Sequence, residues 1–324
     1  MENQEKKHKR RVRYSGAYPK NYREKYKELQ PEKYADTISK VIQKGSTPAG
    51  MHLSICVKEI LDFLKIQPGQ TGLDATLGYG GHTQKMLECL QSEGHLYALD
   101  VDPIESEKTK ERLQTLGYGP DILTVMLQNF ADIDQVAEET GKFDFVLADL
   151  GVSSMQIDNP DRGFSYKTEG PLDLRMNPKK GISAAQRLKD ISVEEFQGML
   201  MENADEPYAQ EIAWEVTDRL RRGEEIATTT QLRQAIEAAL SFIPEKERRE
   251  AVKKSSQRTF QALRIDVNNE YEALYSFLEK LPEVLAPNGR VAILTFHSGE
   301  DKLVKRALKE GYRAGIYSEY AKDV

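Results

Sequence analysis

Long apolar runs are missing from this sequence, and no stretch approaches the ~20 consecutive apolar residues that a membrane-spanning helix needs. The first residues are charged and have no apolar segment behind them, so the sequence predicts no secretory signal peptide. Repeats and low-complexity tracts are also absent. We therefore expect a cytoplasmic protein without membrane association. Its 324 residues suffice for a full α/β domain plus an inserted or second unit.

Cysteine is scarce. The chain holds only Cys56 and Cys89, and these two do not form a C-x-x-C pair. The five histidines show no H-x-x-x-H spacing. These absences argue against a structural zinc site, and we predict no bound metal. Both cysteines stand among apolar residues, so we expect buried free thiols.

The most informative segment runs from Leu73 to His82, LDATLGYGGH, and a second apolar run ends at Asp100. The pattern predicts a buried strand, a glycine turn, a helix and a second strand. Glycines let a ligand approach the backbone, the helix start offers free N–H groups, and a carboxylate ~20 residues later can accept hydrogen bonds from ribose hydroxyls. The glycines read G-x-G-G and lack the third glycine of the dinucleotide fingerprint. This favours S-adenosylmethionine (SAM) over NAD, and an NAD-linked oxidoreductase stays as an alternative.

Continuous apolar runs recur along the chain and predict a parallel sheet covered on both faces. Helical patterns at 83–91 and 104–116 separate the first three runs. The fold class is therefore α/β with a Rossmann-like sheet, and the ligand site is expected beyond the carboxyl ends of the strands. The five predicted strands are 72–77, 95–101, 122–127, 143–150 and 290–296.

The alternation of strands and helices stops between residues 155 and 264. We predict a polar loop at 159–180 and then helices, with Ser192 and a threonine as N-caps. A helix at 264–280 and a turn at Pro287-Asn288-Gly289 lead to the fifth strand. The helices predicted inside the interruption span 193–202, 208–221 and 230–241.

This interruption divides the chain into three expected parts. They are a basic N-terminal extension (1–50), a SAM-binding domain (51–155 and 265–324) and an inserted helical domain for substrate recognition (156–264).

Charge is distributed unevenly along the chain. Residues 1–30 hold ten Lys and Arg against four Glu, a local +6, and because the whole chain carries −6, the remainder carries −12. Tyr14, Tyr18, Tyr22 and Tyr26 alternate with or follow these basic residues. A basic arm with interleaved aromatics suits contacts to phosphates and bases, and a solvated tail is the alternative reading.

Polar residues after the later strands are candidates for chemistry. Asp149 ends the fourth predicted strand, where a carboxylate can accept hydrogen bonds from a cofactor or a substrate amine. A helix N-cap is the alternative role for this aspartate. The loop that follows mixes arginine and aromatic residues, which can clamp a phosphate and stack a base. The substrate candidates are Arg162, Phe164, Tyr166, Arg175, Arg264 and His297.

Seven motifs occur in one order and resemble the MraW-type family of bacterial 16S rRNA cytosine-N4 methyltransferases, from about residue 52 to 308. They are DATLGYGGHT, LDVDP, DLGVSSMQID, RGFSY, PLDLRM, RTFQALRIDVNNE and TFHSGEDKLVK. The resemblance implies a class I methyltransferase fold with an inserted helical domain, SAM as cofactor, and 16S rRNA or the small ribosomal subunit as partner. The cofactor contacts that it implies are Gly80, Gly81, His82, Asp100, Phe130, Asp149 and Gln156.

The chain departs from the family pattern at several places. The family usually has H-x-P-V-L where this chain continues from His52 as HLSICV, and H-S-L-E-D where this chain has Gly299 as the third residue. The basic arm is not general, and the family continues to a basic C-terminal strand where this chain ends soon after Tyr320. These departures indicate a divergent paralogue.

The reaction that the resemblance implies is methyl transfer to the N4 amine of an extruded cytosine. Asp149 or a carbonyl of Leu150-Gly151 is the expected acceptor for the amine, and Phe164 and Tyr166 are the candidate stacking residues. The D-P-P-Y box of DNA amino-methyltransferases is absent, which disfavours a DNA substrate. The alternatives are a non-catalytic SAM-binding RNA-assembly factor, a methyltransferase of a different RNA site, or one of a small molecule or protein. The oligomeric state stays open, with a homodimer as one option.

Overall fold

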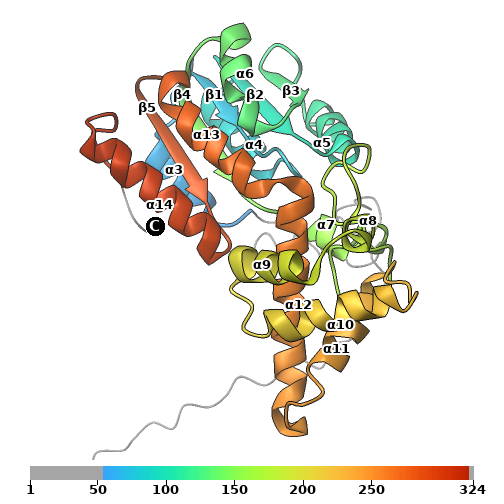
Figure 1. Ribbon diagram of the computed structural model, residues 1–324. Helices are drawn as coiled ribbons and strands as arrows, with labels where there is room; N and C mark the ends of the chain where they lie inside the picture. Colours follow the sequence, from blue (N-terminus) through green and yellow to red (C-terminus); the bar gives the residue numbers. More distant parts are fainter. Residues whose placement is uncertain (1–53, 321–324) are drawn as a thin grey trace, which may run out of the picture. The chain divides into compact units, whose positions relative to one another are not determined.

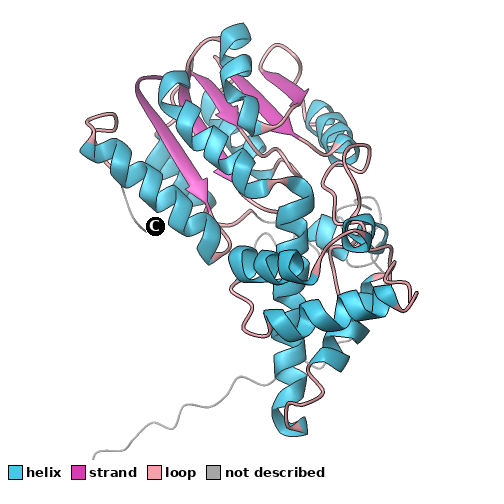
Figure 2. Ribbon diagram, viewed as in Figure 1, coloured by secondary structure: helices cyan, strands magenta, loops and turns pink. Residues whose placement is uncertain are grey.

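A computed structural model describes residues 54–320 of the chain (Figures 1 and 2). Its centre is a five-stranded sheet in the order β3-β2-β1-β4-β5, and every neighbouring pair is parallel. The predicted parallel sheet is therefore confirmed, and the strands lie within a few residues of their predicted positions. They are β1 (Thr71–Asp74), β2 (His95–Asp100), β3 (Leu123–Leu127), β4 (Phe143–Asp149) and β5 (Leu285–Leu294).

The strand order changes direction at one place in this sheet. From β1 the chain first adds β2 and β3 on one side and then crosses to β4 and β5 on the other. Asp74 at the end of β1 lies in register with Leu147 of β4. In open α/β sheets, ligands bind in the crevice outside the carboxyl ends of the strands at such a switch point. The fold thus places the candidate site at the ends of β1 and β4.

Helices cover both faces of the sheet through two separate apolar clusters. One cluster packs Ile60, Met86 and Leu113 against sheet residues such as Leu96 and Phe145. The helical residues of this cluster come from α3 (Val57–Leu64), α4 (Gly81–Leu90) and α5 (Pro103–Thr115). The opposite cluster is contributed by α6 (Ile133–Thr140), α13 (Glu270–Val284) and α14 (Ser298–Arg313). Burial on both faces explains why the strands read as continuous apolar runs.

A helical region interrupts the sheet between β4 and β5, as expected. It has its own core, in which Phe196, Leu200 and Ile212 are fully buried. Ser192 caps its third helix, and Thr228 caps its fifth through a capping box. The helices are α7 (Ser154–Asp158), α8 (Ala184–Lys189), α9 (Val193–Ala204), α10 (Ala209–Arg221), α11 (Thr229–Ala239) and α12 (Glu245–Asn268). Two short 3-10 turns, η2 (Phe130–Asp132) and η3 (Pro160–Arg162), complete the described elements.

Two expectations about local structure are wrong. The predicted helix 264–280 is two helices, because α12 ends at Asn268 and Asn269 turns the chain in the left-handed region with φ 50°. The Pro287-Asn288-Gly289 segment lies inside β5, which begins earlier than predicted and shifts register against Phe143–Phe145. A β-bulge of this kind allows turn-forming residues to lie within a strand.

The expected burial of the cysteines is also wrong. Cys56 is exposed at the start of α3, and Cys89 is only partly buried on α4. Among the described residues, no helix combines the length and apolarity needed to cross a membrane.

The packing of β1 on β4 is tested by Gly72→Ala. A Cβ at Gly72 would stand 2.0 Å from Cζ of Phe145, a fully buried ring that cannot move away. Overpacking of this kind costs about 1–3 kcal/mol of unfolding free energy, measured by urea denaturation. Gly198 on α9 has open space at its Cβ, so Gly198→Ala is the matched control and gains about 0.5–1 kcal/mol. Equal effects at the two positions would contradict this packing.

Candidate active site

Three carboxyl groups end three adjacent strands of the sheet. Asp100 is the last residue of β2, Asp74 of β1 and Asp149 of β4. Parallel strands bring their carboxyl ends to the same edge, so the three side chains gather at the switch point. The sequence predicted Asp100 and Asp149 at strand ends, and the structure confirms both placements.

The protein itself orders the first two carboxylates. Asp100 accepts hydrogen bonds from the N–H of Gly78 and of Asp102, each at 2.8 Å. Asp74 accepts one from the hydroxyl of Thr83 at 2.6 Å and one from the N–H of Thr76 at 3.1 Å. Burial nevertheless raises the pKa of each group to about 6, because desolvation disfavours the charged form.

Asp149 is the least satisfied of the three. Burial, and then the charges of Asp74 and Glu300, raise its pKa to about 7. Its Oδ1 atom is buried without a hydrogen-bond partner, and its Oδ2 atom lies 3.6 Å from Nε2 of His82. Burial lowers the pKa of His82 to about 4, so the ring is neutral, and its Nε2 atom also lacks a partner. Buried polar atoms are normally paired, so these two orphaned atoms mark a place for a polar ligand.

The glycine turn lies beside this pair of orphaned atoms. Gly78 and Gly80 have φ values of 49° and 74°, in the region that favours glycine. Gly80 is the N-cap of α4 and supplies no side-chain cap, so the first N–H groups of the helix stay open to another acceptor. A Cβ at Gly81 would stand 2.3 Å from Oγ of Ser54, so Ser54 packs too closely against this turn for a side chain at position 81.

Two other predicted cofactor residues are held by the protein. Phe130 packs edge-to-face on Phe277, with ring centroids 5.3 Å apart, at the turn that follows β3. Gln156 forms a capping box with Ser153 at the start of α7, and its side-chain amide donates to Asp102 at 2.8 Å.

Asp102 was missed by the sequence reasoning, although it organises this edge of the site. It is fully buried, caps α5, and accepts a 2.7 Å ion-pair hydrogen bond from the equally buried Arg162. The other end of the Arg162 guanidinium donates to the carbonyls of Arg175 and Met176. The N-cap position before Pro103 was the available signal, but nothing local identifies a partner 60 residues away.

The same loop is fixed from its other side by α12. Asn268 accepts a hydrogen bond from the N–H of Met176 at 2.7 Å and donates to the carbonyl of Leu174 at 2.8 Å. Arg175 pairs with Asp173 and donates to a backbone carbonyl at residue 181. The loop is therefore held between the end of β2 and the end of α12.

A cavity of about 340 Å³ lies between the ends of β4 and β5 and helix α12. Four of the six substrate candidates line it, whereas Arg162 and Arg175 are engaged in the loop contacts described above. The lining is mainly apolar and aromatic with a few polar groups, as is usual for small-molecule and base pockets. Its residues include Leu150, Gly151, Val152, Ile157, Phe164, Tyr166, Gln257, Phe260, Gln261, Arg264, Phe296 and His297.

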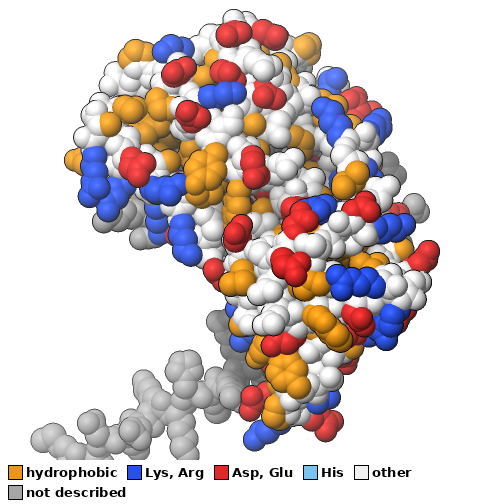
Figure 3. Space-filling model, in the orientation of Figure 1, with side chains coloured by type: hydrophobic (Ala, Val, Ile, Leu, Met, Phe, Trp, Pro, Cys, Tyr) orange, Lys and Arg blue, Asp and Glu red, His pale blue; other side chains and the backbone are white. Residues whose placement is uncertain are grey.

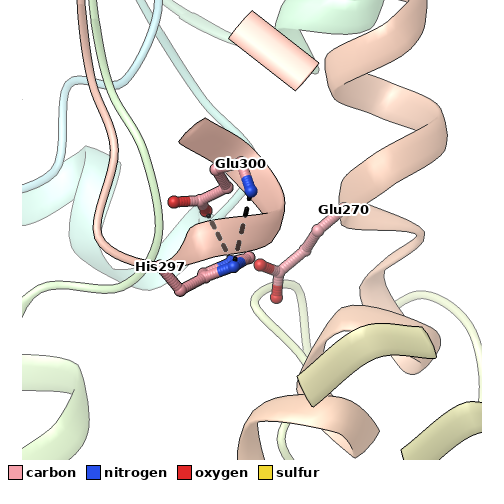
Figure 4. Close-up of side chains that lie close together, drawn as sticks. All are labelled: Glu270, His297 and Glu300. Atoms are coloured by element: carbon pink, nitrogen blue, oxygen red, sulfur yellow. Dashed lines mark hydrogen bonds and ion pairs between the residues drawn. The ribbon is translucent and has the colours of Figure 1, made fainter. Parts of the chain in front are cut away.

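Charged residues next to this cavity pair with one another. Arg264 donates two hydrogen bonds to Glu270, at 2.8 and 2.9 Å, and His297 caps α14 and lies 3.1 Å from Oε1 of Glu300. Figure 4 shows the Glu270 carboxylate directed towards the His297 ring. One potential ligand atom from each of Glu270, His297 and Glu300 lies within 4.8 Å of the others. The guanidinium of Arg264 already supplies a cation to this group.

The departure at Gly299 has a physical reason. A Cβ there would stand 1.9 Å from the hydroxyl oxygen of Tyr271, whose ring lies 5.9 Å from the ring of His297. Tyr271 therefore occupies the space that a side chain at position 299 would need.

A parallel sheet with a glycine turn after β1 and carboxylates at the ends of β2 and β4 is the arrangement with which Rossmann-like α/β enzymes bind nucleoside cofactors. The MraW methylase family matches residues 49–317. The chain is 72% identical over 323 residues to the "Ribosomal RNA small subunit methyltransferase H 1" of Lachnoclostridium phytofermentans, covering 100% of this chain and 88% of the relative. A protein of the same name from Agathobacter rectalis is 68% identical, covering 99% and 92%. The "Ribosomal RNA small subunit methyltransferase H" of Koribacter versatilis is 40% identical, covering 82% and 84%.

The chain belongs to the MraW methylase family. It is a methyltransferase whose cofactor is SAM, as the family resemblance of the sequence implied. A SAM-dependent O-methyltransferase from Thermotoga maritima aligns with 34% of this chain and 37% of its own, at 15% identity and a TM-score of 0.26, a likeness too low to add to this assignment.

The buried pair of Asp102 and Arg162 is tested by Arg162→Met. Removing the guanidinium leaves a buried carboxylate without its cation, which costs about 3–5 kcal/mol of unfolding free energy. Arg222 pairs with Asp218 where the side chains are 57% and 33% exposed, so Arg222→Met is the control and costs at most about 1 kcal/mol. Urea denaturation measures both variants. A loss at Arg162 no larger than at Arg222 would contradict the anchoring role.

Proposed function

We propose that this protein methylates the exocyclic N4 amine of a cytosine in small-subunit (16S) rRNA. The observation that carries the proposal is the 72% identity, along the whole chain, to a protein named for methylation of small-subunit ribosomal RNA. The site supports this proposal, because aromatic residues line a cavity of about 340 Å³. Leu150, the residue directly after Asp149, is also in the cavity wall. A cytosine must leave its stack to reach an enzyme, and a cavity of this kind receives such a base.

Bound SAM supplies an already activated methyl group, so the chain's main task is to position the two reactants. We propose that Asp149 accepts a hydrogen bond from the N4 amine, whose lone pair is otherwise delocalised into the ring. The backbone of Asp149 is fixed by its N–H bond to Thr76 at 2.6 Å, which holds the carboxylate at the strand end. The carbonyls of Leu150 and Gly151 are the alternative acceptors.

The cofactor site is proposed at the orphaned atoms of His82 and Asp149 and at the open N–H groups after Gly80 and Gly81. Asp100 is proposed to accept hydrogen bonds from ribose hydroxyls, beside the two that it already accepts from the backbone. Phe130 stays a proposed cofactor contact. Gln156 and Arg162 are proposed to act through Asp102, which they both contact, as positioning residues.

The helical region 156–264 is proposed as the substrate-recognition domain, and 51–155 with 265–324 as the SAM-binding domain. The helical region has an apolar core separate from the two cores on the faces of the sheet, which supports this division. A role on rRNA supports the proposal that the protein acts in the cytoplasm.

The basic arm, residues 1–50, lies outside the described residues. Relatives that are 65–72% identical align with 99–100% of this chain, whereas those that are 38–40% identical align with 80–82%. The former carry numbered names, H 1 or H 2, which supports the interpretation of a divergent paralogue. Figure 3 shows basic side chains gathered at the left of the upper part, over α14, and acidic and basic side chains interspersed elsewhere on that face. We propose that the arm adds to this attraction for phosphates.

The function is tested with purified small ribosomal subunits from cells that lack this gene, incubated with protein and SAM. Mass spectrometry of the nucleosides is expected to show one new N4-methylated cytidine. Asp149→Asn keeps the shape but removes the charge, and should slow single-turnover transfer about 10²-fold or more while weakening SAM binding less. Binding of SAM without any methylated nucleoside would instead indicate a non-catalytic assembly factor, and a different modified nucleotide would indicate another RNA site.

The pH dependence follows from the raised pKa of Asp149. With a pKa of about 7 in the free protein, the carboxyl is charged above pH 7 and becomes neutral as the pH falls. We therefore expect kcat/KM for SAM, which reports the free enzyme, to fall as pH decreases through about 7. The same profile for Asp149→Asn should lack this decline, and an identical decline in that variant would assign the titration to another group.

A further inference from the structure

The aromatic residues that line the cavity differ in how much of their surface is free. Phe164 is 8% exposed and carries the Arg162 guanidinium at 5.6 Å from its ring centre. Phe260 is 4% exposed and packs edge-to-face with Tyr166. Phe296, in contrast, is 57% exposed. Within residues 54–320, its ring has no aromatic or cationic partner.

The position of Phe296 relates it directly to Asp149. Leu294, two residues earlier, is the register partner of Asp149, and the N–H of Leu150 donates to the carbonyl of Leu294 at 3.1 Å. The Phe296 ring lies beside Gly151, since a Cβ on that glycine would be 4.0 Å from Cδ2 of the ring. The free ring is therefore at the wall of the cavity, beside Gly151, whose carbonyl is one of the alternative acceptors.

The backbone of Phe296 is held although its side chain is free. Its N–H donates to Oε2 of Glu300 at 2.9 Å, and Glu300 is 3% exposed and contacts His297. A large apolar ring left in water gives up the free energy that burial would supply. A fixed backbone with an exposed ring at a cavity wall is the arrangement of a stacking platform.

We propose that Phe296 stacks on the extruded cytosine and so orients its N4 amine towards Asp149. This proposal rests on the proposed function, because it names the residue that holds the base in that reaction. It differs from the sequence-based expectation, which assigned stacking to Phe164 or Tyr166. Stacking on an aromatic ring depends on the π-face and not on apolarity alone, so a ring of different chemistry should replace it and an aliphatic side chain should not.

The test measures single-turnover methylation of purified small ribosomal subunits at saturating SAM, with Phe296→Leu, Phe296→Ala and Phe296→Tyr. Loss of one stacked base contact is expected to slow the Leu and Ala variants roughly 5- to 150-fold, and Phe296→Tyr should stay within about threefold of the wild type. Phe242 is 62% exposed and does not line the cavity, so Phe242→Ala is the control and should be unchanged. SAM affinity should be the same in all variants.

The outcomes separate the two proposals. If the wild type methylates no cytosine, the proposed function fails. If the wild type is active and Phe296→Leu matches it, the function stands and the stacking role is wrong. Equal losses in Phe296→Tyr and Phe296→Leu would also overturn it, because a ring would then be no better than an aliphatic side chain. Folding of each variant is checked by its thermal transition, and the exposed position predicts no change.

Discussion

Three acidic side chains crowded at one edge of a parallel sheet are the constraint on which the rest of the site depends. Asp74, Asp100 and Asp149 end neighbouring strands, and burial raises the pKa of all three. The protein compensates the first two with N–H and hydroxyl donors, but leaves Asp149 beside a neutral histidine with an unpaired oxygen atom. A buried carboxyl group without a cation is unfavourable when charged, so the edge is prepared for a positively charged ligand.

The loop at 159–180 is attached to the same edge of the sheet through Asp102. This residue follows Asp100 by two positions, and its own N–H donates to the Asp100 carboxylate. Its side chain accepts hydrogen bonds from Arg162 and Gln156. Arg162 in turn donates to the carbonyl of Met176, in the part of the loop that contacts α12. The end of β2 and this loop therefore share one buried anchor, and a displacement of either would disturb the other.

The sequence predicted this site where the signal was local. Strand ends are marked by a carboxylate after an apolar run, which located Asp100 and Asp149 correctly. The break at Asn269 was missed because helical periodicity continues on both sides of it, and only a single left-handed residue separates α12 from α13. Arg162 and Asp102 are 60 residues apart in the sequence and meet only in the folded chain, so residue spacing could not predict their ion pair. Phe296 reads as one more apolar residue at the end of a strand, and only its exposure in the folded chain distinguishes it.

We infer that the buried carboxyl groups of Asp74, Asp100 and Asp149 stay partly protonated until the cofactor binds. SAM carries a sulfonium, an ammonium and a carboxylate, a net positive charge, and a nearby cation favours the ionised form of an acid. Calorimetric titration of SAM at pH 6.5, in buffers of different ionisation enthalpy, counts the protons released on binding. We expect proton release by the wild type and a smaller release by Asp149→Asn. Binding of SAM by the wild type with no proton release would contradict it.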